Sequence, residues 1–272
     1  MEYIIYNKSC LEGIKEVKNN SINLIITSPP YWDLKDYGHD EQLGLGMTYE
    51  YYFDSLKNIL KECVRVLKND SFCVINVADI RRNLNDSQDS RPKIISLHCD
   101  IINYFQSMGL DFFAHYIWRH KINHSSGKIY GAQKNGILYP PYVYNELSME
   151  HILVFRKGGP QRKLPKLEDR EDKFSLDEKS DWLQPIWDIN SSKCALHPAT
   201  FPEELVERLI CLYSITGDTI LDPFCGTGTT LVIADKLNRS CIGYEINLNF
   251  LQMLIDKWGM TEKDNCYLRR ID

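Results

Sequence analysis

Short β-branched and leucine-rich runs alternate with amphipathic helical patterns along this chain of 272 residues. The run 22–27 is typical of a strand that is buried on both faces. Residues 49–68 follow it, with apolar side chains at helical spacing. Further strand patterns cover 3–6, 71–77, 111–118, 151–156, 219–221 and 240–244, and helical patterns cover 11–18, 94–108, 202–213, 228–237 and 247–258. The alternation predicts an α/β fold, with one doubly wound, mostly parallel sheet and helices on both faces.

Composition excludes several other classes of protein. With 43% hydrophobic and 25% charged residues, the chain is neither disordered nor fibrous. Its apolar runs are far shorter than the roughly 20 residues of a membrane span, and the first residues do not resemble a signal peptide. Nine cysteines occur without a CxxC pair or a histidine cluster at zinc spacing. We therefore expect reduced thiols, a cytoplasmic location and no metal ion.

The charge is unevenly distributed. The net charge is −5, yet residues 115–166 carry nine basic side chains against two acidic ones, together with four of the seven histidines. Such a basic, aromatic-rich segment on an acidic body indicates a local footprint for a polyanion. A solvated loop would have the same composition, so charge alone does not decide between the two interpretations.

The motif Thr27-Ser-Pro-Pro-Tyr31-Trp lies where a buried parallel strand is predicted to end. Ligands collect at this end of the strands in open α/β sheets. The prolines restrict the backbone, so the Pro29 carbonyl and the Ser28 hydroxyl form two fixed acceptors beside the aromatic ring of Tyr31. Two acceptors of this kind suit an exocyclic amine, whose lone pair they would direct towards an incoming methyl group. A structural turn with packed aromatic side chains is the alternative.

A second motif, Asp222-Pro-Phe-Cys-Gly226-Thr-Gly228-Thr-Thr, reads as strand, glycine turn and helix. It is neither G-x-G-x-x-G nor a Walker A loop. Glycines permit close approach of a ligand to the backbone, and an acidic residue that ends the following strand, here Glu245, binds ribose hydroxyls. Together these features favour a nucleoside cofactor. Cys225 has no nearby base in the sequence, so we interpret it as structural.

A third motif, His197-Pro-Ala-Thr200-Phe-Pro, precedes the helix predicted at 202–213, and Thr200 with Glu203 fits a capping box. Taken together, the three motifs and Ile242-Gly-Tyr-Glu245 resemble the S-adenosylmethionine-dependent DNA amino-methyltransferases. The order, with the catalytic motif before the cofactor motif, is similar to their beta class and its circularly permuted arrangement. The resemblance extends from about residue 3 to 250 and is weakest at 119–188.

The resemblance implies specific roles for these residues. Ser28 and the Pro29 carbonyl would accept hydrogen bonds from the target amine, within a catalytic motif completed by Pro30 and Tyr31, and Tyr31 would stack on the flipped base. Ser28, where adenine-specific members usually carry Asp or Asn, favours N4 of cytosine over N6 of adenine. The S-adenosylmethionine site would comprise Thr27, His197, Pro198, Thr200, Asp222, Pro223, Phe224, Gly226, Thr227, Gly228, Thr229 and Glu245, with Glu245 on the ribose.

Duplex DNA is the implied partner, and a restriction endonuclease acting on the same site is a possible second one. Phosphate contacts are expected from Arg119, Lys121, Lys128, Lys134, Arg156 and Lys157, and base contacts from Asn123, Gln133 and Asn135. Residues 1–118 would form the catalytic half, 119–190 a recognition insertion that includes the strand 151–156, and 191–272 the cofactor half. The remaining alternatives are an N6-adenine enzyme and a nucleic-acid-binding module without activity. In each case we expect the protein to be a monomer or a homodimer.

Overall fold

The computed structural model describes residues 1–83, 92–120, 147–170, 172, 174–190, 201–263 and 266–271. Within these residues ten strands form one sheet, in the order β11-β12-β1-β10-β9-β2-β3-β7-β6-β8. The strands are β1 (Glu2–Tyr6), β2 (Ile22–Thr27), β3 (Leu67–Val77), β6 (Leu110–Arg119), β7 (Met149–Lys157), β8 (Ile186–Asp188), β9 (Thr219–Asp222), β10 (Ser240–Tyr244), β11 (Thr261–Lys263) and β12 (Cys266–Arg270).

The centre of the sheet is parallel. Strands β1, β10, β9, β2 and β3 run in the same direction, with each strand hydrogen-bonded to the next. On one side β7 runs antiparallel to both β3 and β6, and on the other side β12 runs antiparallel to β1. The predicted mostly parallel sheet is therefore confirmed, and antiparallel strands extend it at both sides. The segment 119–190 contributes β8 to this sheet in addition to the strand that we predicted.

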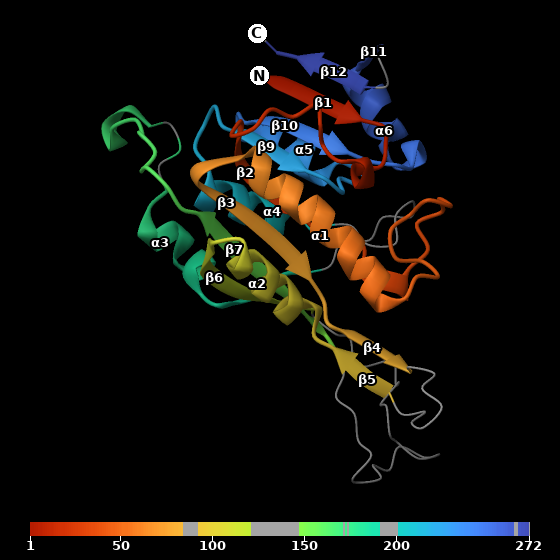
Figure 1. The fold of residues 1–272 in the computed structure, drawn as a ribbon. Helices are drawn as coiled ribbons and strands as arrows, with labels where there is room; N and C mark the ends of the chain where they lie inside the picture. Colours follow the sequence, from red (N-terminus) through yellow and green to blue (C-terminus); the bar gives the residue numbers. More distant parts are fainter. Residues whose placement is uncertain are drawn as a thin grey trace.

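Helices cover both faces of the sheet, as the sequence predicts. Helices α1 (Tyr49–Val66) and α2 (Leu97–Ser107) pack on one face, whereas α4 (Glu203–Tyr213), α5 (Thr229–Lys236) and α6 (Leu248–Trp258) pack on the other (Figure 1). Thr48 caps α1, because its hydroxyl accepts a hydrogen bond from the Tyr51 N–H. The apolar stripe of α1, including Leu56 and Leu60, is buried in the core. Each such side chain contributes about 1.5–3 kcal/mol on burial.

Two helix predictions need correction. Residues 11–18 do not form a helix: a short 3₁₀ turn, η1 (Cys10–Glu12), ends at Gly13, whose φ is +88°. Ile14 and Val17 are buried all the same, so the three-residue spacing of apolar side chains reflects burial and not a helix. The helix predicted from residue 94 begins at Leu97, because the preceding residues belong to strand β5 (Pro92–Ile95). Strand β5 pairs with β4 (Ile80–Asn83) in a hairpin that projects from the body of the protein (Figure 1).

Helix α4 begins one residue after the predicted start, with Pro202 as its N-cap residue. Among the described residues, no side chain caps the helix there. Thr200, which we predicted as the cap, lies outside the described residues. Proline is well suited to a helix start because it lacks the N–H that the first turn leaves unpaired.

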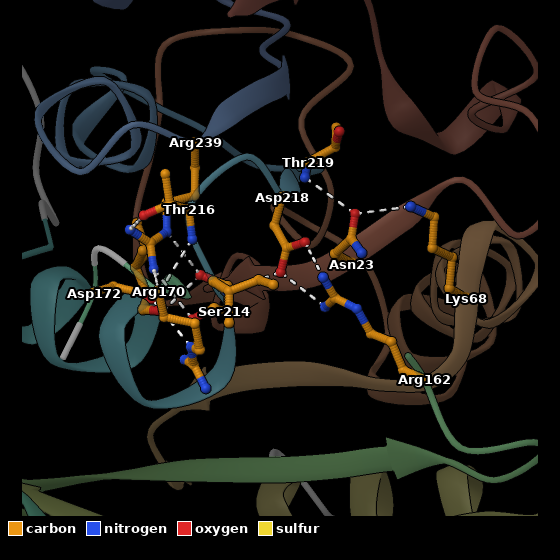
Figure 2. A network of polar contacts seen from close by, with 12 residues as sticks. Asn23, Lys68, Arg162, Arg170, Asp172, Ser214, Thr216, Asp218, Thr219 and Arg239 are labelled. Atoms are coloured by element: carbon orange, nitrogen blue, oxygen red, sulfur yellow. Dashed lines mark hydrogen bonds and ion pairs between the residues drawn. The ribbon is translucent and has the colours of Figure 1, made fainter. Parts of the chain in front are cut away.

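Residues 157–181, which lie within the predicted recognition insertion 119–190, are attached to the body by ion pairs that are buried or partly buried. The segment includes η4 (Leu167–Asp169) and α3 (Leu176–Lys179), and η5 (Ser180–Leu183) follows directly. Arg162 forms an ion pair with Asp218, and Asp172 forms one with Arg239, whose side chain is 2% exposed (Figure 2). Arg239 also donates to the Ser214 hydroxyl and carbonyl. The segment thus packs against the loop between α4 and β9.

Within the described ranges, no helix is both long and apolar enough to cross a lipid bilayer.

Candidate active site

The two main sequence motifs meet at a topological switch point of the sheet. Strands β2 and β9 are parallel neighbours, with Leu24 opposite Ile220. The helix that follows β2 is α1, on one face, and the helix that follows β9 is α5, on the other. Diverging connections of this kind open a crevice beyond the carboxyl ends of the two strands, where ligands bind in open α/β sheets.

A cavity of about 400 Å³ occupies this crevice. Its volume lies within the usual range for small-molecule sites. The lining includes Ser28, Pro30 and Tyr31 from the first motif and Asp222, Pro223, Phe224, Gly226, Thr227 and Thr229 from the second, together with Glu245. The structure therefore brings together residues that are about 200 positions apart in the sequence.

The Tyr31 hydroxyl is the centre of a hydrogen-bond network. It accepts from the Ser28 hydroxyl (3.0 Å) and from Asn76 Nδ2 (2.9 Å), and it donates to Glu150 Oε2. Because the Ser28 proton is directed at Tyr31, the lone pairs of Ser28 Oγ remain available as acceptors. Burial and the Glu150 carboxylate both raise the pKa of Tyr31 well above its ordinary value, so the phenol stays protonated.

Glu150 is a site residue that the sequence analysis missed. Besides Tyr31, it accepts from Asn76 Nδ2, and its other oxygen lies 2.9 Å from His120 Nε2. Its side chain is only 13% exposed, and these partners satisfy both carboxylate oxygens. Glu150 lies in β7, whose antiparallel pairing with β3 places His151 opposite Val77. A pairing between strands about 70 residues apart leaves no local signal in the sequence.

The turn at Tyr31 is fixed from behind by the main chain and by α1. The Pro30 carbonyl accepts hydrogen bonds from the Trp32 N–H (2.9 Å) and from the Tyr52 hydroxyl (2.6 Å). The Trp32 indole N–H donates to the Met47 carbonyl at 2.7 Å. Trp32 has a positive φ of 48°, a strained conformation for a bulky residue. The turn therefore requires these surrounding contacts to hold its shape.

On the other side of the cavity, Glu245 lies over the glycine turn. Its Oε2 accepts from the Gly226 N–H (2.9 Å), and its Oε1 accepts from the Asn247 N–H (2.8 Å). Burial raises the pKa of Glu245 to about 7, and these two N–H groups oppose that increase. A carboxylate in this position, at the end of β10, can accept hydrogen bonds from the hydroxyls of a ribose.

Asp222 and Cys225 are both buried in the glycine-turn motif but differ in their chemistry. Burial raises the pKa of Asp222 to about 6, although the Thr230 hydroxyl (2.7 Å) and the Phe224 N–H (3.1 Å) donate to its carboxylate. Burial also raises the pKa of the Cys225 thiol well above its ordinary value. A protonated, buried thiol is a poor nucleophile, which supports the structural interpretation of Cys225.

Three predicted site residues do not line the cavity. Thr27 and Pro29 are buried in the chain on either side of Ser28. Gly228 is the N-cap of α5, and a Cβ at this position would lie 2.3 Å from Leu254 Cδ2 of α6. Gly228 is therefore required for its φ of +79° and for helix packing rather than for contact with a ligand. His197, Pro198 and Thr200 lie outside the described residues.

The predicted DNA-contacting residues are only partly described. Arg119 lies at the carboxyl end of β6, on the same edge of the sheet as the cavity, and forms a bidentate pair with Asp188. Arg156 and Lys157 lie at the opposite edge, because β7 runs antiparallel to β3 and Lys157 is opposite Ser71. Lys157 Nζ donates to the carbonyls of Val64 and Leu67, so it anchors α1 rather than facing the cavity. The remaining candidates, which lie outside the described residues, are Lys121, Asn123, Lys128, Gln133, Lys134 and Asn135.

Further lining residues come from loops that the motifs did not indicate. Lys8 to Leu11 follow β1, and Tyr37, Gln42 and Leu43 belong to the loop after the first motif. Strand β1 is a parallel neighbour of β10, so its carboxyl end lies beside Glu245. The Asn7 amide fixes this contact by donating to the Glu245 carbonyl at 2.9 Å. Because the carboxyl ends of parallel strands lie at one edge of the sheet, the strand predicted at 3–6 could have indicated that the loop containing Lys8 to Leu11 lines the cavity.

Comparison with known proteins assigns the family. The family model described as DNA methylase matches residues 22–256. The chain is 32% identical to Type II methyltransferase M.MjaI of Methanocaldococcus jannaschii, with 91% of this chain and 88% of that protein covered. It is also 32% identical to Type II methyltransferase M.MthZI of Methanothermobacter thermautotrophicus, with 98% and 80% covered.

Solved structures show the same fold. A candidate DNA modification methylase of Thermus thermophilus, complexed with S-adenosyl-L-methionine, matches with a TM-score of 0.71 and 29% identity over 93% of each chain. The PvuII DNA methyltransferase, which is cytosine-N4-specific, matches with a TM-score of 0.62 and 18% identity over 89% of this chain and 81% of that one. Given the family match, the two relatives above 30% identity and the shared fold, the chain belongs to the DNA methylase family, as an S-adenosylmethionine-dependent amino-methyltransferase of the beta class.

Proposed function

We propose that this enzyme methylates the exocyclic N4 amine of a cytosine that is flipped out of duplex DNA. The observation that carries the proposal is the cavity at the switch point, where Ser28 and Tyr31 face the same space as Glu245. One part of this cavity suits a nucleoside cofactor and the other suits a flat base with an amine. Direct transfer between two bound molecules needs such a shared cavity and no covalent intermediate.

The residues on the cofactor side fit S-adenosylmethionine. Glu245 would accept hydrogen bonds from the ribose hydroxyls, and the Gly226 turn allows the ligand to approach the backbone. The carboxylates of Glu245 and Asp222 give this part of the cavity an acidic character that suits a cationic ligand. When bound, S-adenosylmethionine supplies an electrophilic methyl group.

On the target side, Ser28 Oγ lines the cavity and would accept one N–H of the amine. The Pro29 carbonyl, which the resemblance implies as the second acceptor, does not line the cavity, so the turn would have to shift towards the base for it to accept the other N–H. These hydrogen bonds would draw the nitrogen lone pair out of conjugation and direct it towards the methyl donor. The ring of Tyr31 would stack on the base, an interaction worth about 1–3 kcal/mol. Glu150 and Asn76 are positioning residues here, because they hold the Tyr31 hydroxyl and through it the Ser28 proton.

The same network connects the amine to a carboxylate. Methyl transfer leaves an extra proton on the target nitrogen, and this proton must be lost to restore the neutral amine. Hydrogen bonds lead from Ser28 through Tyr31 to the side chain of Glu150, which we assign as the proton acceptor at the end of this path. His120, at the other oxygen of Glu150, lines the cavity and can relay the proton to solvent.

Cytosine is favoured over adenine because position 28 carries a serine. In the adenine-specific members that the sequence resembles, Asp or Asn usually occupies this position, and either base presents two N–H donors. Recognition of a specific duplex sequence would fall to the recognition insertion 119–190, and flipping the base costs a few kcal/mol. The names of M.MjaI and M.MthZI, both Type II methyltransferases, support a role in restriction-modification.

Nucleoside analysis tests this proposal. Unmethylated bacteriophage DNA is incubated with the protein and methyl-labelled S-adenosylmethionine, digested to nucleosides and separated. We expect label in N4-methylcytosine. Label in N6-methyladenine would support the proposed methyl-transfer site but would show that the target base is adenine and not cytosine. An unlabelled product from protein that binds S-adenosylmethionine would favour the inactive binding module.

Two variants of Tyr31 separate its ring from its hydroxyl. Tyr31→Ala removes both and should abolish turnover, whereas the cofactor dissociation constant should stay near the wild-type value. Tyr31→Phe keeps the stacking surface and loses only the network to Ser28 and Glu150, so it should retain partial turnover. Unchanged turnover in Tyr31→Ala would refute the stacking role.

A further inference from the structure

Histidine and aspartate side chains from separate segments converge beside Glu150. Asp79 lies between β3 and β4, His98 is in the first turn of α2, and His151 is in β7. Each offers one ligand atom, and the three atoms all lie within 4.8 Å of one another. These side chains are 15%, 19% and 8% exposed, respectively, so the cluster is largely shielded from solvent. It is separate from the cavity that holds Ser28 and Glu245.

Both imidazoles are directed at the same carboxylate. His98 Nδ1 lies 2.6 Å from Asp79 Oδ1, and His151 Nε2 lies 3.7 Å from Asp79 Oδ2. The first distance is a hydrogen bond, whereas the second is too long for one. The two rings stack in parallel, with centroids 3.9 Å apart and planes 5° apart. A histidine–carboxylate hydrogen bond accounts for His98 but not for the placement of His151.

The nitrogens on the far side of both rings also have partners. His151 Nδ1 lies 3.1 Å from His115 Nε2, and His98 Nε2 lies 3.3 Å from Cys99 Sγ. In metal sites the second nitrogen of a ligating histidine is usually hydrogen-bonded, which fixes the tautomer and the ring orientation. His115 and Cys99 occupy the positions of such outer partners. Three possible metal-ligand atoms thus face one another, and a hydrogen-bond partner on the far side of each imidazole holds that ring in place.

We propose that Asp79, His98 and His151 bind one Zn²⁺ ion. Two imidazole nitrogens and one carboxylate oxygen form a donor set that suits zinc, with water completing the coordination. Magnesium and calcium prefer oxygen ligands and are disfavoured by the two nitrogens. The three ligands are separated by 19 and 53 positions in the sequence, which is why the spacing of histidines and cysteines did not predict a metal site.

The position of the site determines which segments of the chain a bound ion would join. Asp79 directly precedes the β4–β5 hairpin, and His98 begins α2 soon after the hairpin ends. His151 pairs with Val77 in the sheet and is the neighbour of Glu150. A bound ion would therefore attach the base of the hairpin and the start of α2 to the strand that carries Glu150.

Zinc titration of the chelator-treated protein tests the site directly. Isothermal calorimetry should give about one Zn²⁺ per chain, and a large excess of Mg²⁺ should not compete. Asp79→Asn and His98→Gln should each weaken zinc binding at least about tenfold, the lower bound seen when even an outer partner is lost. His39→Gln is the matched control, because His39 lies outside the cluster, and it should bind zinc within about twofold of wild type.

Thermal unfolding provides a second readout that does not depend on methylation. Zinc should raise the unfolding midpoint of the wild type and of His39→Gln, but not that of Asp79→Asn or His98→Gln, because a ligand stabilises only the state that binds it. Circular dichroism without zinc checks that each variant is folded. Absence of zinc binding by the wild type, or equal zinc affinity in the wild type and both ligand variants, would overturn the proposal.

Discussion

The raised pKa of Glu245 predicts how cofactor binding depends on pH. Only the ionised carboxylate accepts hydrogen bonds at both oxygens, so the ribose hydroxyls select that form. In the ligand-free cavity burial raises the pKa of Glu245 to about 7, despite the opposing Gly226 and Asn247 N–H groups. Lowering the pH from 8 to 6 therefore protonates the residue before the cofactor can bind, and affinity should fall.

The magnitude follows from the ionised fraction. With a pKa of about 7 the carboxylate is about nine-tenths ionised at pH 8 and about one-tenth ionised at pH 6. The dissociation constant for S-adenosylmethionine should therefore rise about tenfold, which is about 1.4 kcal/mol. Asp222, with a pKa of about 6, is half ionised at pH 6 and adds a factor of at most about two.

Isothermal calorimetry at pH 8, 7 and 6 measures this dependence. Glu245→Gln is the control, because it keeps the shape of the side chain and leaves Asp222 in place. We expect weaker cofactor binding by the variant at pH 8, with a change of at most about twofold down to pH 6. The wild-type change should exceed that of the variant by about tenfold. Equal pH dependence in the two proteins would refute the role of Glu245.

The same pKa has the opposite consequence for stability. Because the folded-state pKa lies above the unfolded value of about 4.5, the contribution of Glu245 to stability is fully present below pH 4.5 and is lost as the pH rises through 7. The loss amounts to at most about 3 kcal/mol. Without cofactor, Glu245→Gln should therefore gain unfolding free energy relative to wild type between pH 5 and pH 8. Chemical denaturation at both values measures this, and no relative gain would contradict the burial of Glu245.

Three further variants probe the network, the turn and the buried ion pair. Glu150→Gln should lower turnover roughly 10²-fold, because it disturbs the contact that positions the Tyr31 ring and also removes the proton acceptor, with the cofactor dissociation constant within about twofold of wild type; normal turnover would count against both roles. Gly228→Ala should destabilise the fold by about 1–2 kcal/mol in chemical denaturation, because φ is +79° and the new methyl group would meet Leu254; no loss would contradict this strain. Arg239→Ala leaves the Asp172 carboxylate without its buried partner and should cost about 3 kcal/mol, the low end for such pairs, since Asp172 keeps Arg170; a loss below about 1 kcal/mol would show that water replaces the guanidinium.

The centre of the fold could be predicted because local pattern and burial agree there. Strand β2 has the predicted bounds, since a strand flanked by parallel neighbours is apolar on both faces. The pattern failed at 11–18, where Ile14 and Val17 pack into the core from a loop. The spacing of apolar residues indicates which side chains are buried, but it does not fix the backbone conformation. The 3₁₀ turn ends at Gly13, whose φ is positive, so the backbone does not continue as a helix.

The residues of the candidate site likewise fall into those that the sequence could predict and those that it could not. Ser28, Tyr31, Gly226 and Glu245 could be identified because each lies within a few residues of the carboxyl end of a strand, and parallel strands end at one edge of the sheet. Glu150 could not, since it reaches the cavity from the start of an antiparallel strand whose partner is far away in the sequence. Local glycine content likewise could not distinguish Gly226, which contacts the ligand cavity, from Gly228.

A crystal structure of the protein with bound S-adenosylmethionine would show whether the two motifs form one methyl-transfer site. We expect the ribose hydroxyls to lie on the Glu245 carboxylate and the sulfonium methyl group to point towards Ser28 Oγ and the ring of Tyr31. A cofactor bound elsewhere, or one whose methyl group points away from Ser28, would contradict the claim that the two motifs form one methyl-transfer site.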